Sequence, residues 1–150
     1  MSYVTTFHSP VSYHEVEKEG EETNTMAIRI LSVDDDQSLQ ELVLMHLALQ
    51  GFEAKAAANG EEAISLLEHE SFDLILLDLE MPKMDGLEVL RYIKIRRINV
   101  RPIMLTGADN LLALNECAHW GAFDYLPKPY NFHELMNSIE RVLAEEVHTG

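Results

Sequence analysis

The sequence holds only one cysteine, Cys117, among its 150 residues. A single cysteine cannot form an internal disulfide, so a fold held together by disulfides is excluded and a reducing compartment is expected. The chain has no run of about 18 consecutive apolar residues, which argues against a membrane-spanning helix. Residues 1–25 also lack the basic start and apolar centre of a signal peptide, and we expect a cytoplasmic protein.

Basic residues are scarce as well, since 11 Lys and Arg stand against 26 Asp and Glu, for a formal net charge of −15. This charge disfavours direct contact with nucleic acid or with an anionic membrane, because both contacts need basic patches. The seven histidines show no His-x-x-x-His spacing, so a zinc site is not expected.

Apolar residues make up 47% of the chain, which is enough for one packed domain. Residues 1–26 differ from the rest, because they show no sustained periodicity and carry five glutamates between positions 15 and 22. We predict a flexible acidic extension over 1–26, a folded domain over 27–147 and a short tail over 148–150.

Four consecutive large apolar residues, Leu74 to Leu77, run directly into Asp78. An apolar run without alternation is typical of a strand buried on both faces of a parallel sheet. Further strands are predicted at 28–33, 52–57, 102–106 and 123–126. A helical pattern follows each strand, so the chain is expected to be an α/β protein with a doubly wound five-stranded parallel sheet.

The helix boundaries are predicted from capping residues. The pairs Asn59–Glu62, Asp85–Glu88 and Asn131–Glu134 have the spacing of N-cap and N3 residues. Asp36 is interpreted in the same way, as a cap rather than a metal ligand. The fourth helix is expected from about Asn110 to Trp120, and Pro127-Lys128-Pro129 is expected to form a rigid turn.

Polar side chains that stand out from the apolar pattern fall at the ends of the predicted strands: Asp34, Asp35, Asp78, Thr106 and Lys128. The carboxyl ends of parallel strands share one edge of a doubly wound sheet, where ligands bind. Carboxylates that are brought close together must protonate or bind a cation, and hard oxygen ligands suit Mg²⁺. With a lysine and a hydroxyl beside them, they indicate phosphoryl transfer to an aspartate oxygen.

The same residues carry a resemblance to a known family. The motifs are Asp34-Asp35 after Ile-Leu-Ser-Val, Asp78 after Leu-Ile-Leu-Leu, Met-Pro-Lys-Met-Asp-Gly at 81–86, Thr106 after Pro-Ile-Met-Leu, and Asp-Tyr-Leu-Pro-Lys-Pro at 124–129. From about Ile28 to Leu143 the chain resembles the receiver domain of two-component response regulators, of the chemotaxis type. The resemblance implies a flavodoxin-like fold with strand order 2-1-3-4-5.

The resemblance also implies a role for each matching residue. Asp78 would accept a phosphoryl group from the phosphohistidine of a sensor histidine kinase or a histidine phosphotransfer protein. Asp34 and Asp35 would hold Mg²⁺ together with Asp78 and the backbone carbonyl of Glu80. Lys128 would pair with Asp78 and then with the phosphoryl oxygens, and the Lys128–Pro129 peptide bond would be cis.

Thr106 and Tyr125 would act as the switch that reports phosphorylation to the surface formed by the fourth helix, fifth strand and fifth helix. The output protein on that surface is unknown, and the chain is expected to be a monomer or a weak, phosphorylation-dependent dimer. A related DNA-binding subgroup carries a dimer-forming arginine ten residues after the lysine, whereas this chain has Ser138. Glu80, two residues past Asp78, is hypothesised to tune the lifetime of the phosphoryl group.

Other functions stay open at this point. The chain could be a degenerate receiver that binds partners without phosphorylation, although it retains the acidic pair and the lysine. We expect a receiver that stands alone and acts by protein–protein contact, and the alternative is the receiver of a longer DNA-binding or enzymatic regulator. A phosphatase of the haloacid dehalogenase type is disfavoured, because that family has Asp-x-Asp on its first strand and this chain has Asp78-Leu79-Glu80 on its third.

Overall fold

The computed structural model describes residues 27–107 and 110–145. The predicted extension over 1–26 and tail over 148–150 lie outside these residues, and so does Ala108. Five strands alternate with five helices along the described chain. The strands are β1 (Arg29–Val33), β2 (Glu53–Ala57), β3 (Leu74–Asp78), β4 (Arg101–Gly107) and β5 (Asp124–Lys128). The helices are α1 (Gln37–Leu49), α2 (Gly60–His69), α3 (Gly86–Ile95), α4 (Leu111–His119) and α5 (Phe132–Ala144).

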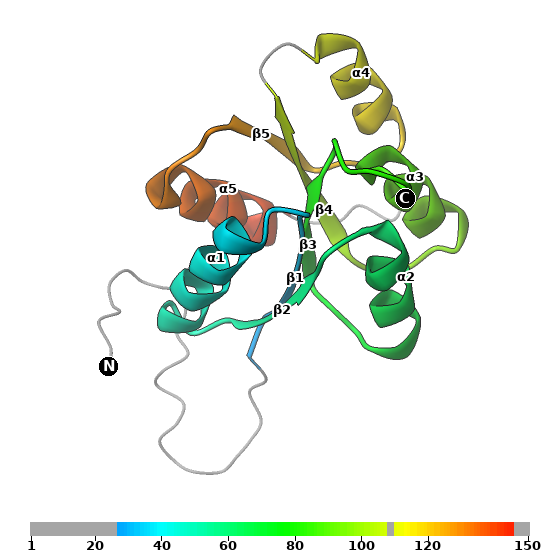
Figure 1. The fold of residues 1–150 in the computed structure, drawn as a ribbon. Coiled ribbons are helices and arrows are strands. Elements are labelled where there is room, and N and C mark those ends of the chain that lie inside the picture. The colour runs from blue at the N-terminus through cyan, green and yellow to red at the C-terminus, as the bar shows by residue number, and fades with distance from the viewer. Residues whose placement is uncertain (1–26, 108–109, 146–150) are drawn as a thin grey trace.

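All strands pair in parallel in the order β2-β1-β3-β4-β5, which confirms the predicted sheet. Helices α1 and α5 lie on one face of the sheet, and α2 and α3 lie on the other (Figure 1). Each crossover returns the chain to the same edge, so all five strands end on one side of the molecule. That side is where the polar residues at the strand ends were expected to meet.

The apolar run of β3 is explained by its central position. All five residues of the strand are buried, and successive side chains enter two different cores. Ile75 and Leu77 pack toward α2 and α3, whereas Leu74 and Leu76 pack toward α1 and α5. Burying one such side chain stabilises the fold by about 1.5–3 kcal/mol, so an unbroken apolar strand is the expected solution between two helical layers.

Four helices begin at a residue whose side chain accepts a hydrogen bond from a backbone N–H in the first turn. These N-caps are Asp36, Asn59, Asp85 and Asn131, and each accepts from the amide three residues later. Asn131 and Glu134 form a complete capping box. The capping predictions, including Asp36 as a cap, are confirmed.

The prediction for the end of the fifth strand is wrong. β5 continues through Pro127 and Lys128, which pair with Thr106 and Gly107 of β4. Gly107 thus belongs to β4 and not to the following connection. Pro127 is tolerated because β5 is an edge strand, where a residue without an N–H can face away from the ladder. The Lys128–Pro129 bond is cis, as the resemblance implied.

Arg29, the first residue of β1, holds together the amino-terminal ends of the strands, on the side of the sheet opposite to the strand ends that carry the aspartates. Its guanidinium donates to Glu53 Oε1 at 2.9 Å, to Glu70 Oε1 at 2.8 Å and to the carbonyl of Ser71 at 2.6 Å. The same group lies over the ring of Phe72, 4.8 Å from its centroid. One cation therefore ties together β1, β2 and the segment between α2 and β3, and Lys55 Nζ, 2.7 Å from Glu70 Oε2, adds a second positive charge.

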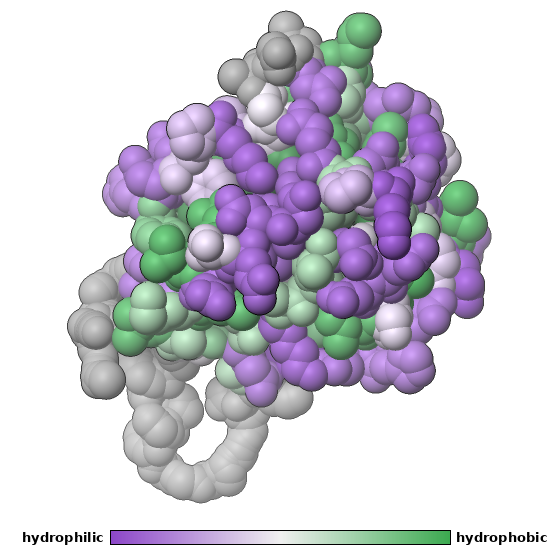
Figure 2. Space-filling view, viewed as in Figure 1, coloured by the Kyte–Doolittle hydropathy of each residue, from purple (hydrophilic) through white to green (hydrophobic). Residues whose placement is uncertain are grey.

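The visible surface is mostly hydrophilic, with apolar patches between the polar side chains (Figure 2). Among the residues that the structure describes, the large apolar side chains that are exposed are Leu42, Met45, Leu49, Ile95 and Leu112. Within 27–107 and 110–145, the structure contains no helix with the length and apolar character needed to cross a membrane.

We predict that Gly86→Ala destabilises the fold, because Gly86 sits against the backbone that carries Asp78. An added Cβ would lie 2.3 Å from the Asp78 carbonyl oxygen and 2.8 Å from Leu79 Cα. Neither atom can move without shifting β3, so the free energy of unfolding should fall by about 1–3 kcal/mol in urea titrations. Gln37→Ala, at the same first position of α1 but exposed, is the matched control. Equal midpoints for Gly86→Ala and wild type would contradict this packing.

Candidate functional site

Three carboxylates meet at the carboxyl edge of the sheet. Asp34 and Asp35 directly follow β1, and Asp78 ends β3, its neighbour in the sheet. One oxygen from each of the three residues lies within 4.8 Å of the others. Asp34 and Asp78 are 3% and 1% exposed, whereas Asp35 is open to solvent. The sheet topology thus brings together the acidic residues that the sequence placed at separate strand ends.

Lys128, the last residue of β5, reaches across to two of these carboxylates. Its Nζ lies 3.1 Å from Asp34 Oδ2 and 3.2 Å from Asp78 Oδ2. Asp34 Oδ1 accepts from the backbone N–H of Asp36 at 2.9 Å. Asp34 Oδ2, however, is buried and has no hydrogen bond of good geometry among the described residues, despite its short distance to the lysine. One ammonium therefore serves two buried anions and satisfies neither completely.

The acid–base properties follow from this arrangement. Burial, and after it the neighbouring charge of Asp34, raise the pKa of Asp78 to about 6, although Lys128 and the Glu80 N–H act in the opposite direction. Burial would lower the pKa of Lys128, but the close negative charges of Asp34 and Asp78 outweigh it, and its pKa is raised. Lys128 therefore stays protonated, whereas Asp78 changes its protonation state at a pH of about 6.

The donor set fits a magnesium ion. Mg²⁺ prefers hard oxygen ligands, takes one or two carboxylates and keeps positions for water and phosphate oxygens. Here three carboxylates converge, one of their buried oxygens lacks a hydrogen bond, and one side of the cluster faces solvent through Asp35. A divalent cation would supply the positive charge that a single lysine does not.

Thr106 and Tyr125 lie where the sequence placed them. Thr106 is buried on β4, one residue beyond the pair Asp78–Leu105, and its hydroxyl donates to the carbonyl of Gly107 at 3.2 Å. The hydroxyl of Tyr125, on β5, donates to the carbonyl of Leu114 in α4 at 3.3 Å. Tyr125 therefore links β5 to α4, whereas the Thr106 hydroxyl is bonded to the adjacent residue.

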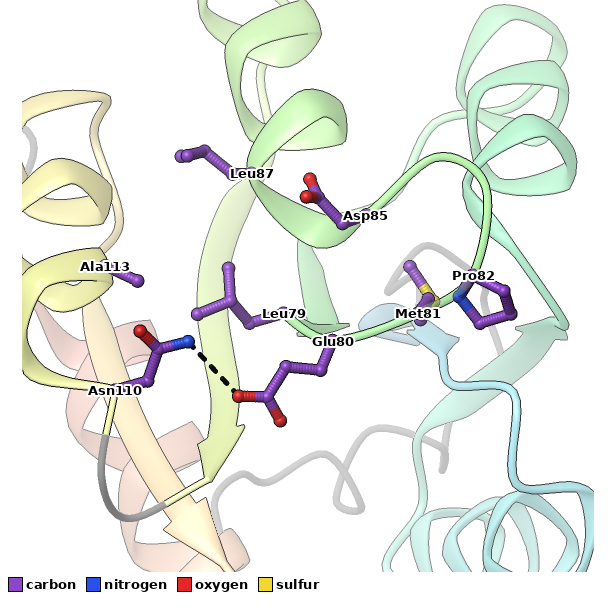
Figure 3. Close-up of a pocket in the computed structure, with 8 residues that line it drawn as sticks. All are labelled: Leu79, Glu80, Met81, Pro82, Asp85, Leu87, Asn110 and Ala113. Carbon is purple, nitrogen blue, oxygen red and sulfur yellow. Dashed lines mark hydrogen bonds between the residues drawn. The ribbon is translucent and has the colours of Figure 1, made fainter.

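Glu80 is held at both ends. Its backbone N–H donates to Asp78 Oδ1 at 3.1 Å, and its carboxylate accepts from Asn110 Nδ2 at 3.2 Å. Figure 3 shows the two side chains pointing toward each other at one end of a shallow pocket of about 330 Å³. This pocket lies between the β3–α3 loop and the start of α4, next to the carboxylate cluster. Sequence reasoning predicted Asn110 only as the start of a helix.

Ser138 occupies the position of the dimer-forming arginine of the related subgroup, and it lies in the interior of the protein. Ser138 is fully buried, and its hydroxyl donates to Asp124 Oδ2 at 2.7 Å. Arg141 donates to the same oxygen. Burial opposes ionisation of Asp124, but these hydrogen bonds outweigh it and lower its pKa. Asp124 is therefore neutralised within its own chain.

This arrangement matches one family. Residues 30–140 match the response regulator receiver domain, and the chain belongs to that family. It is 42% identical over 120 residues to a transcriptional regulatory protein CpxR homolog of Haemophilus influenzae, covering 77% of this chain and 50% of that protein. It is 35% identical over 118 residues to the response regulator MprA of Mycolicibacterium vanbaalenii, covering 79% and 51%. The chain thus spans about half the length of the curated relatives it matches.

Solved structures agree with the family assignment. The chemotaxis protein CheY4 of Vibrio cholerae superimposes with a TM-score of 0.74 at 30% identity, covering 78% of this chain and 99% of that chain. The response regulator TrrA of Thermotoga maritima, solved in complex with Mg²⁺-BeF, superimposes with a TM-score of 0.69 at 35% identity, covering 77% and 98%. The protein is thus a receiver domain of the chemotaxis-receiver type, used in two-component signalling.

We predict that Asp78→Asn stabilises the metal-free protein at pH 7.5. The pKa of Asp78 is about 6 in the folded state and lies near 3.8 when unfolded, so its ionisation costs stability as pH rises through this window. Removing the charge should raise the free energy of unfolding by about 1–3 kcal/mol at pH 7.5, and by less at pH 5. Denaturant titrations with a chelator present measure both values.

Asp36→Asn is the control for this substitution, because Asp36 is exposed and asparagine caps a helix equally well. We expect no stabilisation from it at either pH. If Asp78→Asn did not raise the free energy of unfolding, or raised it equally at pH 5 and pH 7.5, ionised Asp78 would not be destabilising.

Proposed function

We propose that the protein is a phosphoacceptor in two-component or phosphorelay signalling, in which Asp78 receives a phosphoryl group from a phosphohistidine. The donor would be a sensor histidine kinase or a histidine phosphotransfer protein. The observation that carries the proposal is the buried Asp78 carboxylate, which shares one sheet edge with two further aspartates and a single lysine. Family membership supports the same chemistry.

In the proposed reaction, an Asp78 carboxylate oxygen forms a bond to phosphorus while the phosphorus–nitrogen bond of the donor breaks. The electron pair returns to the imidazole nitrogen, which takes up a proton. Asp34, Asp35, Asp78 and the backbone carbonyl of Glu80 would hold Mg²⁺, and the ion would neutralise charge on the phosphoryl oxygens. Lys128 already lies beside Asp78 and would form an ion pair with the phosphoryl group.

Thr106 and Tyr125 are the proposed switch. The Thr106 hydroxyl, which donates to the Gly107 carbonyl, would turn to donate to a phosphoryl oxygen. Tyr125 would change rotamer and lose its bond to Leu114, which would alter the position of α4. The output would then be a change in the surface formed by α4, β5 and α5, where a partner protein binds.

The whole protein's output is also a proposal. The curated relatives are about twice as long as the matched region, and one of them is described as a transcriptional regulatory protein. A receiver acting alone and the receiver of a longer DNA-binding regulator both fit this observation. We propose that the domain works in the cytoplasm as a monomer or weak dimer. Ser138 stands where the related subgroup has its dimer-forming arginine, and it is buried and bonded to Asp124, so it is not available for dimer pairing.

The first test is incubation with Mg²⁺ and acetyl phosphate followed by intact mass measurement. We expect wild type to gain one phosphoryl group, Asp78→Asn to gain none, and Asp36→Asn to behave as wild type. Chelation of the metal should abolish the gain. If wild type gained nothing, a degenerate receiver that binds partners without phosphorylation would be favoured; a gain that persisted in Asp78→Asn would exclude Asp78 as the acceptor.

Glu80 is proposed to tune the lifetime of this phosphoryl group, because its backbone is tied to Asp78 and its carboxylate lies at the edge of the site. We expect Glu80→Gln to change the rate at which phosphorylated protein loses its phosphoryl group, measured by mass after removal of the donor. An unchanged rate would remove Glu80 from the hydrolysis step.

A further inference from the structure

Asn110 is the one N-cap among the described helices whose side chain does not cap its helix. The N-cap side chains of α1, α2, α3 and α5 each accept from an amide of their own first turn. Asn110 makes no such bond, and its Nδ2 donates to Glu80 instead. A local rule that holds elsewhere in a fold and fails at one position often marks a functional constraint.

The partner of Asn110 is an acidic side chain beside an already crowded anionic site. Glu80 follows Asp78 by two residues, and its backbone N–H donates to Asp78 Oδ1, whereas the Glu80 side chain is exposed. Asp34, Asp35 and Asp78 lie together at this edge, with Lys128 bonded to two of them. A further carboxylate turned toward Asp78 would repel an incoming phosphoryl donor, which is itself an anion.

We propose that Asn110 is a positioning residue for phosphorylation: it holds the Glu80 carboxylate at the start of α4, away from the path of the phosphoryl donor. This inference rests on the proposed phosphorylation of Asp78. In the structure, the Glu80 side chain runs along the rim of the pocket toward Asn110 (Figure 3). Glu80 therefore connects Asp78, which its backbone N–H contacts, to the beginning of α4, which its carboxylate contacts.

The hydrogen bond does not need to be strong to have this effect. An exposed bond of this kind contributes little to overall stability. It only has to bias a side chain among its rotamers, because the repulsion depends on where the charge is placed. The function of the contact should accordingly appear in the rate of phosphorylation and not in the unfolding midpoint.

The test compares Asn110→Ser in two backgrounds, wild type and Glu80→Gln. Serine is neutral and is a good N-cap, but it is too short to reach Glu80. We expect Asn110→Ser to slow phosphorylation by acetyl phosphate roughly fivefold, the effect of one like charge near a hydrated site. In the Glu80→Gln background, the same substitution should leave the rate unchanged, since no charge is released.

A purely structural role for Asn110 predicts a different pattern. Loss of α4 structure would give the same defect in both backgrounds, and that result would overturn the inference. Ionic strength gives a second readout, because repulsion between charges is screened by salt. The Asn110→Ser defect should shrink at high salt, whereas a defect that is independent of salt would contradict a charge effect.

A third measurement does not depend on phosphorylation. In the unmodified protein, Glu80→Ala should shift the side-chain amide resonances of Asn110 in NMR spectra, and unshifted resonances would overturn the contact itself. The two proposals can thus fail separately. Wild type that takes up no phosphoryl group would refute the proposed function, whereas normal phosphorylation of Asn110→Ser would refute the positioning role alone.

Discussion

Two buried carboxylates compete for one ammonium group at the carboxyl edge of the sheet. Asp34 and Asp78 are fixed there because β1 and β3 are adjacent parallel strands that end together, and Lys128 arrives from β5 at the far side. Neither anion can move into solvent without dismantling the centre of the sheet. The chemistry of the site therefore follows from an electrostatic deficit that the fold itself maintains.

This charge deficit contrasts with the side of the sheet where the strands begin. There Arg29 lies between two carboxylates, one of which also pairs with Lys55, and its guanidinium contacts a carbonyl and an aromatic ring, so several segments are joined. The protein thus separates the interactions that stabilise the fold from those that bind and react. A bound cation or phosphoryl group can change the balance at the reactive edge while the Arg29 cluster keeps the strands in register.

The sequence predicted the features that depend on local pattern. The apolar run before Asp78 could only be a central strand, and Asp36, Asn59, Asp85 and Asn131 capped helices as their spacing indicated. Two features were missed because they depend on tertiary neighbours. Pro127 continues the strand because β4 pairs with it at the edge of the sheet. The Asn110 side chain does not cap its helix and bonds to Glu80, which lies within reach.

The proline within β5 has a consequence for recognition. β5 forms one edge of the sheet, and an open edge normally invites another extended chain to pair with it through backbone hydrogen bonds. Pro127 removes a donor from this short strand, and Pro129 follows directly after its last residue. A partner on this side therefore cannot simply add a strand. It has to recognise side chains, and the side chains of Tyr125 and α4 are the ones that the proposed switch would move.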